Sequence, residues 1–173
     1  LWNGNQQITA GGAASSTIAS IIGVTGNNNT ITVNADSTLN LTGGIKNSDW
    51  YGNGSTPGGI IKAGSGTLSI SGSSSYSGDT VITGGTLKLQ GATFSNTPRA
   101  YAIASGAVLN LDGDSAFATG TTTLSGNGTL RISGGTLANG IGPGRNLNFA
   151  LGSGAVIDLQ AGAGIVNGGW QSM

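Results

Sequence analysis

The side chains that could do acid–base or metal chemistry in this chain are few. Its six carboxylates are all aspartates, and the closest pair is Asp112 and Asp114, two residues apart. Two such carboxylates could help to hold a calcium ion through oxygen ligands. Calcium-binding loops use more acidic positions than this, so a metal site is not the main expectation. A two-carboxylate glycosidase could use any Asp pair that the fold brings within about 5–10 Å, but the sequence singles out none.

Other common chemistries are excluded by composition. The chain has no His and no Cys, which removes Ser-His-Asp and Cys-His nucleophilic sites, the usual zinc sites, haem ligation and disulfides. Its glycine runs do not end in the Gly-Lys-Ser/Thr of a phosphate loop. Six basic residues at a net charge of zero make no nucleic-acid-binding patch. We expect no cofactor and no enzymatic activity.

The best candidate for a binding site is the stretch KNSDWYGNGSTPGG at residues 46–59. It places the adjacent aromatics Trp50 and Tyr51 beside Asp49 and Asn53. An aromatic face next to amide and carboxylate groups could stack on a sugar ring, and long loops on a rigid scaffold often carry recognition. The alternative is that Trp50 folds back to cover the end of the core. The ligand prediction therefore rests on Asp49, Trp50, Tyr51 and Asn53.

The element that would position these groups is a short repeated strand. Within residues 64–89, the phrase Gly-Thr-Leu-x-apolar occurs twice, ending at Ile70 and at Leu89. Apolar residues alternate with polar ones and glycines bound each copy, as in a strand of about five residues. The same apolar-x-apolar centre recurs along the chain at Leu39/Leu41, Leu68/Ile70, Leu87/Leu89, Leu109/Leu111, Leu130/Ile132 and Ile157/Leu159.

These centres repeat at a spacing that indicates a solenoid. Most steps are near twenty residues, and the longer ones contain insertions. A second apolar column runs six residues ahead of the first, through Val33, Val81, Ile103, Leu124 and Leu151. One rung cannot bury its apolar side alone, so we expect rungs of about 20–22 residues to stack about 4.8 Å apart around one core. Parallel pairing is favoured, although the corners would also suit antiparallel hairpins.

The outward residue between each inward pair predicts one surface ladder. If the rungs stack in sequence, no like charges are adjacent and Arg131 neighbours Asp158, as stacked strands require. The ladder comprises Asn40, Ser69, Lys88, Asn110, Arg131 and Asp158.

We expect one domain over residues 1–173, with insertions at about 46–59, 91–100 and 139–146. The 34 glycines lack the triplet period of collagen, and Ile, Val and Leu at strand spacing argue against disorder. No stretch reads as a signal peptide or as an apolar run long enough to span a membrane. The chain therefore looks like a piece of a longer exported protein, with no membrane insertion by this segment.

The phrase within residues 64–89 resembles a known family. GTLSISG, then YSGDTV, then GGTLKL are similar to the autotransporter-associated β-strand repeat, also called the passenger-associated transport repeat. Ser74 stands where the family usually has Asn, and Asp79 where it usually has Gly. The resemblance implies a right-handed parallel β-helix that is exported to the bacterial cell surface or secreted. It implies no particular binding activity.

Two classes of function remain open. The first is a non-catalytic stalk or adhesin, whose partner would be a host or environmental glycan or a surface protein, and not a nucleic acid. The second is a polysaccharide-binding or polysaccharide-cleaving β-helix, such as a lyase or a tailspike-like hydrolase, which would need carboxylates and basic groups gathered on one face.

Overall fold

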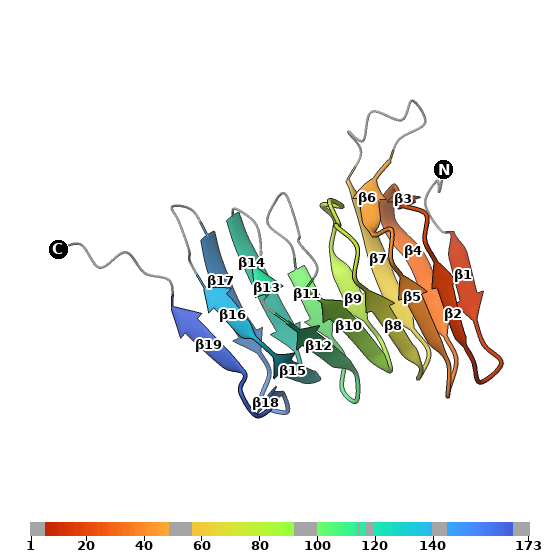
Figure 1. The fold of residues 1–173 in the computed structure, drawn as a ribbon. Helices are drawn as coiled ribbons and strands as arrows, with labels where there is room; N and C mark the ends of the chain where they lie inside the picture. The colour runs from red at the N-terminus through yellow and green to blue at the C-terminus, as the bar shows by residue number, and fades with distance from the viewer. Residues whose placement is uncertain are drawn as a thin grey trace.

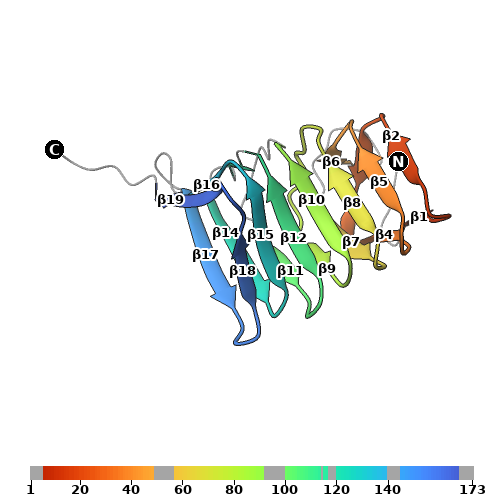
Figure 2. The ribbon, with the colours of Figure 1, turned by 60° about the horizontal axis from the view of Figure 1, so that its bottom comes forward.

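The computed structural model describes residues 6–48, 57–91, 100–113, 115–116, 120–139 and 145–167. These residues form strands joined by corners, and every strand pairing is parallel. Successive strands of each sheet come from successive rungs, so the chain coils around one elongated core (Figures 1 and 2). The predicted all-β parallel solenoid is confirmed. The antiparallel alternative is wrong for the described strands.

Two seven-stranded sheets form the long sides of the solenoid. Sheet A contains β1 (Gln7–Ala10), β4 (Gly26–Val33), β7 (Gly58–Ala63), β9 (Thr80–Ile82), β11 (Ala100–Ile103), β14 (Gly120–Gly126) and β17 (Arg145–Leu151). Sheet B contains β2 (Ser15–Ile18), β5 (Thr38–Leu41), β8 (Thr67–Ile70), β10 (Thr86–Gln90), β12 (Val108–Asp112), β15 (Thr129–Gly134) and β18 (Val156–Leu159). Each strand of sheet A is followed, after a tight corner, by one of sheet B.

A third side returns the chain from sheet B to sheet A. It is made of one pair, β3 (Ile22–Val24) with β6 (Ile45–Asn47), and of three strands, β13 (Ser115–Ala116), β16 (Thr136–Asn139) and β19 (Gly164–Asn167). Between the two groups, the Ser75 N–H donates to the Ile45 carbonyl at 2.8 Å. The third side is thus less regular than sheets A and B, and it is where rungs differ most in length.

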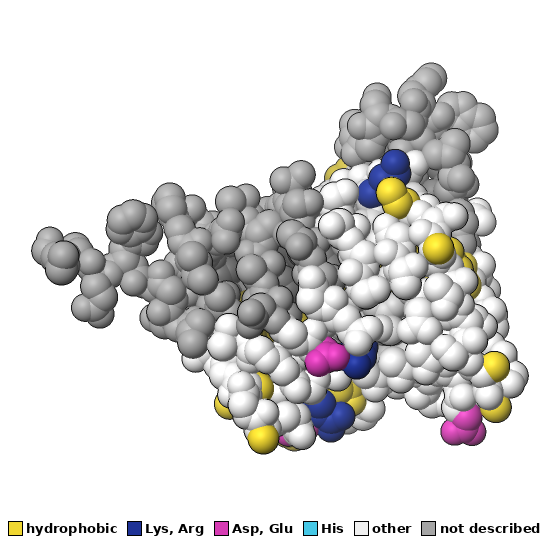
Figure 3. Space-filling model, in the orientation of Figure 1, with side chains coloured by type: hydrophobic (Ala, Val, Ile, Leu, Met, Phe, Trp, Pro, Cys, Tyr) yellow, Lys and Arg dark blue, Asp and Glu magenta, His cyan; other side chains and the backbone are white. Residues whose placement is uncertain are grey.

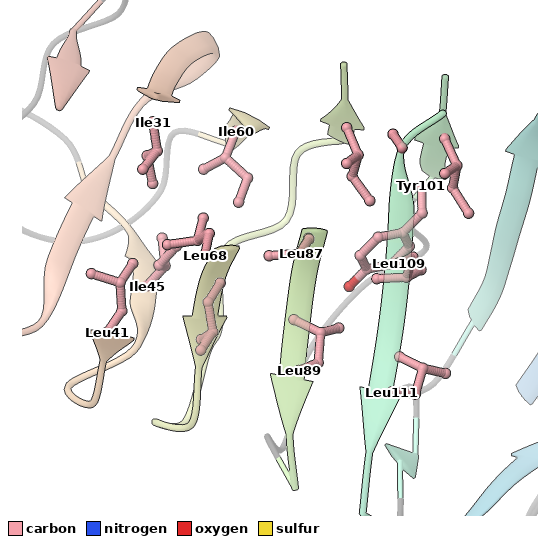
Figure 4. Packing of buried hydrophobic residues seen from close by; sticks show 14 of the residues in the cluster. Ile31, Leu41, Ile45, Ile60, Leu68, Leu87, Leu89, Tyr101, Leu109 and Leu111 are labelled. Carbon is pink, nitrogen blue, oxygen red and sulfur yellow. The ribbon is translucent and has the colours of Figure 1, made fainter. Parts of the chain in front are cut away.

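The core is built from the apolar residues that the repeat singled out. In sheet B, Leu68 pairs in register with Leu39 and with Leu87, and the same register continues through Leu109 and Leu130. The five leucines of this column are at most 2 % exposed, and Leu68, Leu87 and Leu109 point into the space between the sheets (Figure 4). Because a rung covers the one before it, Leu68, Leu87 and Leu109 each lie between leucines of the neighbouring rungs. At the ends of the column, Leu39 pairs with Ser16 and Leu130 with Ile157. The predicted inward column is confirmed.

The last described rung differs from those before it. Ile157 and Leu159 of β18 pair in register with the buried Leu130 and Ile132 of β15, yet they are 46 % and 50 % exposed. Phe149 of β17 is also partly exposed, at 37 %. Among the described residues β18 is the edge strand of sheet B and β17 that of sheet A, so no further rung covers the apolar side of this one.

The second predicted column is correct in part. Val33, Ile103 and Leu124 are buried as expected, and Leu151 is partly buried. They do not form one column, however, because Ile103 pairs with Gly126 while Leu124 pairs with Tyr101. Val81 is half-buried, and Ile82 takes the inward place in β9. Ile82 lies five residues before Leu87, whereas Ile103 lies six before Leu109. The corner after β9 is one residue shorter than the corner after β11, which moves the inward position by one.

Glycine is required at the corners where one rung lies directly on another. Gly126 has a φ of +103°, and a Cβ built there would lie 2.2 Å from the carbonyl oxygen of Ile103. Both the positive φ and the close approach of backbone exclude a side chain. The glycine content therefore reflects the tight stacking of the corners.

Candidate functional site

The predicted ligand-binding residues Asp49, Trp50, Tyr51 and Asn53 lie outside the described residues. The structure does describe where their segment joins the scaffold. On one side, Ser48 donates its N–H to the carbonyl of Val24 at 2.8 Å; on the other, the carbonyl of Pro57 accepts the N–H of Gly26 at 2.9 Å. Both ends of the segment are therefore bonded to the preceding rung.

Asn47 fixes the base of this segment. Its Oδ1 accepts the N–H groups of Gly58 at 3.0 Å and Ser77 at 2.9 Å, and its Nδ2 donates to the Ser77 hydroxyl at 2.7 Å. One amide thus joins the end of β6, the start of β7 and the next rung. Side-chain amides bond backbone in this way at turns, where the ladder of the sheet is interrupted.

Asn29 makes a second amide contact beneath the same segment. This residue is fully buried, and its Nδ2 lies 2.9 Å from each of the carbonyls of Thr25, Gly26 and Gly59. The Oδ1 of Asn29 has no hydrogen-bond partner among the described groups. The register of β4 and β7 shifts between Gly26 and Asn29, so Asn29 bonds backbone carbonyls at the place where the pairing of these strands is irregular.

Four internal segments that lie outside the described residues meet the scaffold along one edge. Those at 49–56, 92–99, 117–119 and 140–144 each end within one residue of the start of a strand of sheet A. These strands are β7, β11, β14 and β17, and all strands of sheet A are parallel. Their amino ends therefore lie along one edge of the sheet, which we call the amino edge (Figure 1). At β11 this edge is held by Asp79, whose carboxylate accepts the Ala100 N–H at 3.1 Å.

Of the minor metal candidate, Asp112 and Asp114, the structure describes only Asp112. Asp114 lies outside the described residues, and the Asp112 carboxylate is 2.8 Å from the Lys88 ammonium and 3.3 Å from the Gln90 amide nitrogen. The hydrogen bond from Lys88 lowers the pKa of Asp112 below its ordinary value. Within the part of the chain that the structure describes, no three metal-binding side chains gather. Asp112 serves as an ion-pair partner there.

The residues of the predicted surface ladder pair in the order that the sequence spacing predicts. Asn40 pairs with Ser69, Ser69 with Lys88, and the series runs on through Asn110, Arg131 and Asp158. Arg131 Nε lies 2.7 Å from the Asp158 carboxylate, and this hydrogen bond lowers the pKa of Asp158. On the face drawn in Figure 3, acidic and basic side chains lie side by side near the lower middle, while one basic group near the top and one acidic group at the lower right stand apart.

One ladder position departs from the expectation of an outward, solvated residue. Ser69 is only 5 % exposed, and its hydroxyl donates to the Gln90 side chain at 3.0 Å. Gln90 in turn donates to Asp112, which binds Lys88. A short serine is thus covered by the longer side chains of the next rung, and Ser69, Gln90, Asp112 and Lys88 form one chain of polar contacts.

The sequence reasoning missed Lys62. This lysine lies in β7, six residues before Leu68, the same spacing that identified Ile103 ahead of Leu109. The signal was present, but a lysine is rarely expected in an apolar column. Its side chain is fully buried, and its ammonium contacts only backbone carbonyls among the described groups.

None of the described segments is a helix that could cross a lipid bilayer.

Comparison with known proteins supports the fold and the repeat. Residues 60–89 match the family model of the passenger-associated-transport-repeat. The matched residues run from β7 to β10 and include both copies of the Gly-Thr-Leu phrase, so the predicted resemblance is confirmed there. No curated protein and no solved structure matched the chain. The repeat and the solenoid together fit a passenger-type β-helix of the kind that bacterial autotransporters carry.

Proposed function

We propose that this chain is a non-catalytic β-helical segment of a bacterial surface-exposed or secreted protein. It acts as a stalk or adhesin and recognises its partner through the segments that join the amino edge. The observation that carries this proposal is the alignment of four such attachment points along one edge of a rigid parallel sheet. The passenger-associated repeat at residues 60–89 supports the location outside the cell.

The partner that this edge suits best is a glycan, or a surface protein that carries one. The segment at 49–56 supplies Trp50 and Tyr51 together with Asp49 and Asn53. Aromatic side chains offer a large apolar face with few rotatable bonds, while amide and carboxylate groups bond hydroxyls. Asn47 and Asn29 hold the base of this segment against two rungs, which lowers the entropy that binding must remove.

Three of the four described carboxylates have contacts that favour a structural role over an acid–base role. Asp112 and Asp158 each bind a cationic side chain, and Asp79 accepts a backbone N–H. A carboxylate held in an ion pair is a poor general acid because the neighbouring cation keeps it ionised. The alternative, a polysaccharide lyase or hydrolase, would require a pair of carboxylates that these contacts do not use.

A product assay separates the two classes. The purified chain is incubated with acidic and neutral polysaccharides, and reducing ends and unsaturated uronic ends are measured over time. We expect no product above the level of a heat-denatured sample. Steady formation of either product, lost when the protein is unfolded, would replace the stalk or adhesin with the enzymatic alternative.

A binding assay tests the recognition segment. The chain is immobilised and screened against a glycan panel and against cell surfaces, and each ligand found is measured with Trp50→Ala and Tyr51→Ala. We expect at least a tenfold weaker affinity in either variant. The matched control is Phe149→Ala, which removes an exposed aromatic side chain from a strand of sheet A and should leave the affinity unchanged. Unchanged binding in both loop variants would remove this segment from the proposal.

A further inference from the structure

Lys62 is a buried ionisable group that the proposed function does not use. In sheet A it lies in register between Ile31 of β4 and Ile82 of β9, within a column of buried apolar side chains. Burying an ammonium group in such surroundings is costly unless polar partners replace the water it loses. The side chain is 0 % exposed, so these partners must come from the protein.

Three backbone carbonyls replace that water. Lys62 Nζ donates to Ala63 O at 2.9 Å, Gly64 O at 2.8 Å and Gly84 O at 3.0 Å. An ammonium group carries three N–H donors, so donors and acceptors match one to one. Ala63 and Gly64 belong to the end of β7 and its corner, while Gly84 belongs to the corner one rung later. A single charged group therefore ties two stacked corners together.

The protonation state of Lys62 decides how many of these bonds exist. A neutral amine has only two N–H donors, so one of the three carbonyls would lose its donor. The Gly84 contact is the longest of the three and the only one that crosses to another rung. The Lys62 carbonyl still accepts the Thr83 N–H at 2.9 Å, so loss of the proton would loosen the Gly84 corner without separating β7 from β9.

No described carboxylate stabilises the charge. Strands β4, β8 and β9 carry no ionisable side chain, and neither do the corners at 64–66 and 83–85. Asp36, on the corner of the preceding rung, is exposed, and Lys88 of β10 is bound to Asp112 on the outer face. Proton loss from Lys62 is thus opposed by the three carbonyl dipoles alone.

We propose that Lys62 is a proton-dependent clamp: the charged ammonium fixes the Gly84 corner to the corner of the preceding rung, and loss of the proton releases it. Burial lowers the pKa of Lys62 to about 8. The corner is therefore released at a pH close to neutrality, and not only under strongly alkaline conditions. Both halves of the clamp lie within residues 60–89, the segment that matches the passenger-associated repeat. The device is therefore internal to one repeat.

The clamp is tested by nuclear magnetic resonance on the whole chain. The Cε resonance of Lys62 reports its own proton, and the amide nitrogen of Gly85 reports the bond to the Gly84 carbonyl, because the two share a peptide group. Both are followed from pH 6 to pH 10.5. We expect the Gly85 nitrogen to shift with the same midpoint as Lys62 Cε, at a pH well below that of an ordinary lysine.

Two variants separate the clamp from general effects of pH. Lys62→Met keeps an apolar stem of similar length, removes the donors and should abolish the Gly85 step. Lys88→Met removes an outward lysine in the same segment and should leave the step unchanged. If Lys62→Met does not fold, the titration of the unaltered chain still decides. A Gly85 nitrogen that stays still while Lys62 titrates, or a Lys62 midpoint at the ordinary lysine value, would overturn the proposal.

Discussion

The two leucines Leu89 and Leu159 allow the stacking of the core to be measured with one kind of substitution. They occupy the same inward column of sheet B, connected in register through Leu111 and Ile132. Leu89 is 0 % exposed and Leu159 is 50 % exposed. Leu89→Ala removes the same atoms as Leu159→Ala, but only Leu89 has a rung on both sides. Any difference in cost therefore comes from stacking.

The expected costs differ severalfold. Leu89→Ala loses the transfer free energy of the buried atoms and leaves a cavity, which together cost about 3 kcal/mol, within a range of about 2–5 kcal/mol. Leu159→Ala removes a side chain that is already half in water and encloses no cavity, so it should cost about 1 kcal/mol or less.

Urea unfolding followed by circular dichroism measures both costs, with a second optical probe to show whether the rungs unfold together, since stacked repeats can lose cooperativity. Equal costs for the two variants would refute the reasoning.

Three further predictions follow from single contacts. Gly126→Ala should lower the free energy of unfolding by about 2 kcal/mol or more, because it adds a close backbone contact to an unfavourable φ. Gly106→Ala should lower it less, because φ there is +78° but no atom lies within 4 Å of the added Cβ. Equal urea midpoints for the two variants would contradict this. Because burial lowers the pKa of Lys62, the unfolded chain holds more protons than the folded chain between pH 8 and 10.5. The free energy of unfolding of the unaltered chain, relative to that of Lys62→Met, should therefore rise with pH across this window and stay level below it. Urea midpoints of the two proteins that change equally with pH would count against the buried ammonium. The lowered pKa of Asp112 makes stability rise with pH in the same sense, but in an acidic window. Its stabilising effect is present at neutral pH and is lost as pH falls through the folded pKa, so Asp112→Asn should flatten part of the acid side of a plot of unfolding free energy against pH. An unchanged acid side would contradict a stabilising Lys88 contact.

Much of this fold could be predicted because its core obeys a spacing rule. The inward leucines of sheet B recur in the sequence at the same intervals at which the strands pair, so register and the order of the outward ladder followed from counting residues. The ion pair of Arg131 with Asp158 was predictable for the same reason. Where every rung repeats one pattern, long-range contacts are encoded locally.

The departures arise where a corner or a side chain breaks the pattern. The short corner after β9 moved the inward position from Val81 to Ile82, since a difference of one residue reverses the face of a strand. Lys62 was missed because residue type outweighed spacing, although three carbonyls make a buried ammonium tolerable at that place. The recognition residues Asp49, Trp50, Tyr51 and Asn53 stay a prediction, since an insertion has no repeat from which its contacts could be counted.

The parallel stacking of rungs can be tested most directly by engineered disulfides, which is straightforward because the chain has no cysteine. Thr67, Thr86 and Val108 lie in one outward column on three successive rungs. Neighbouring strands are about 4.8 Å apart, within the reach of a disulfide, whereas two steps of the stack exceed it. Thr67→Cys with Thr86→Cys should form a disulfide on mild oxidation, and Thr67→Cys with Val108→Cys should not. A disulfide in the second pair, or none in the first, would contradict the parallel solenoid and with it the alignment of the amino edge.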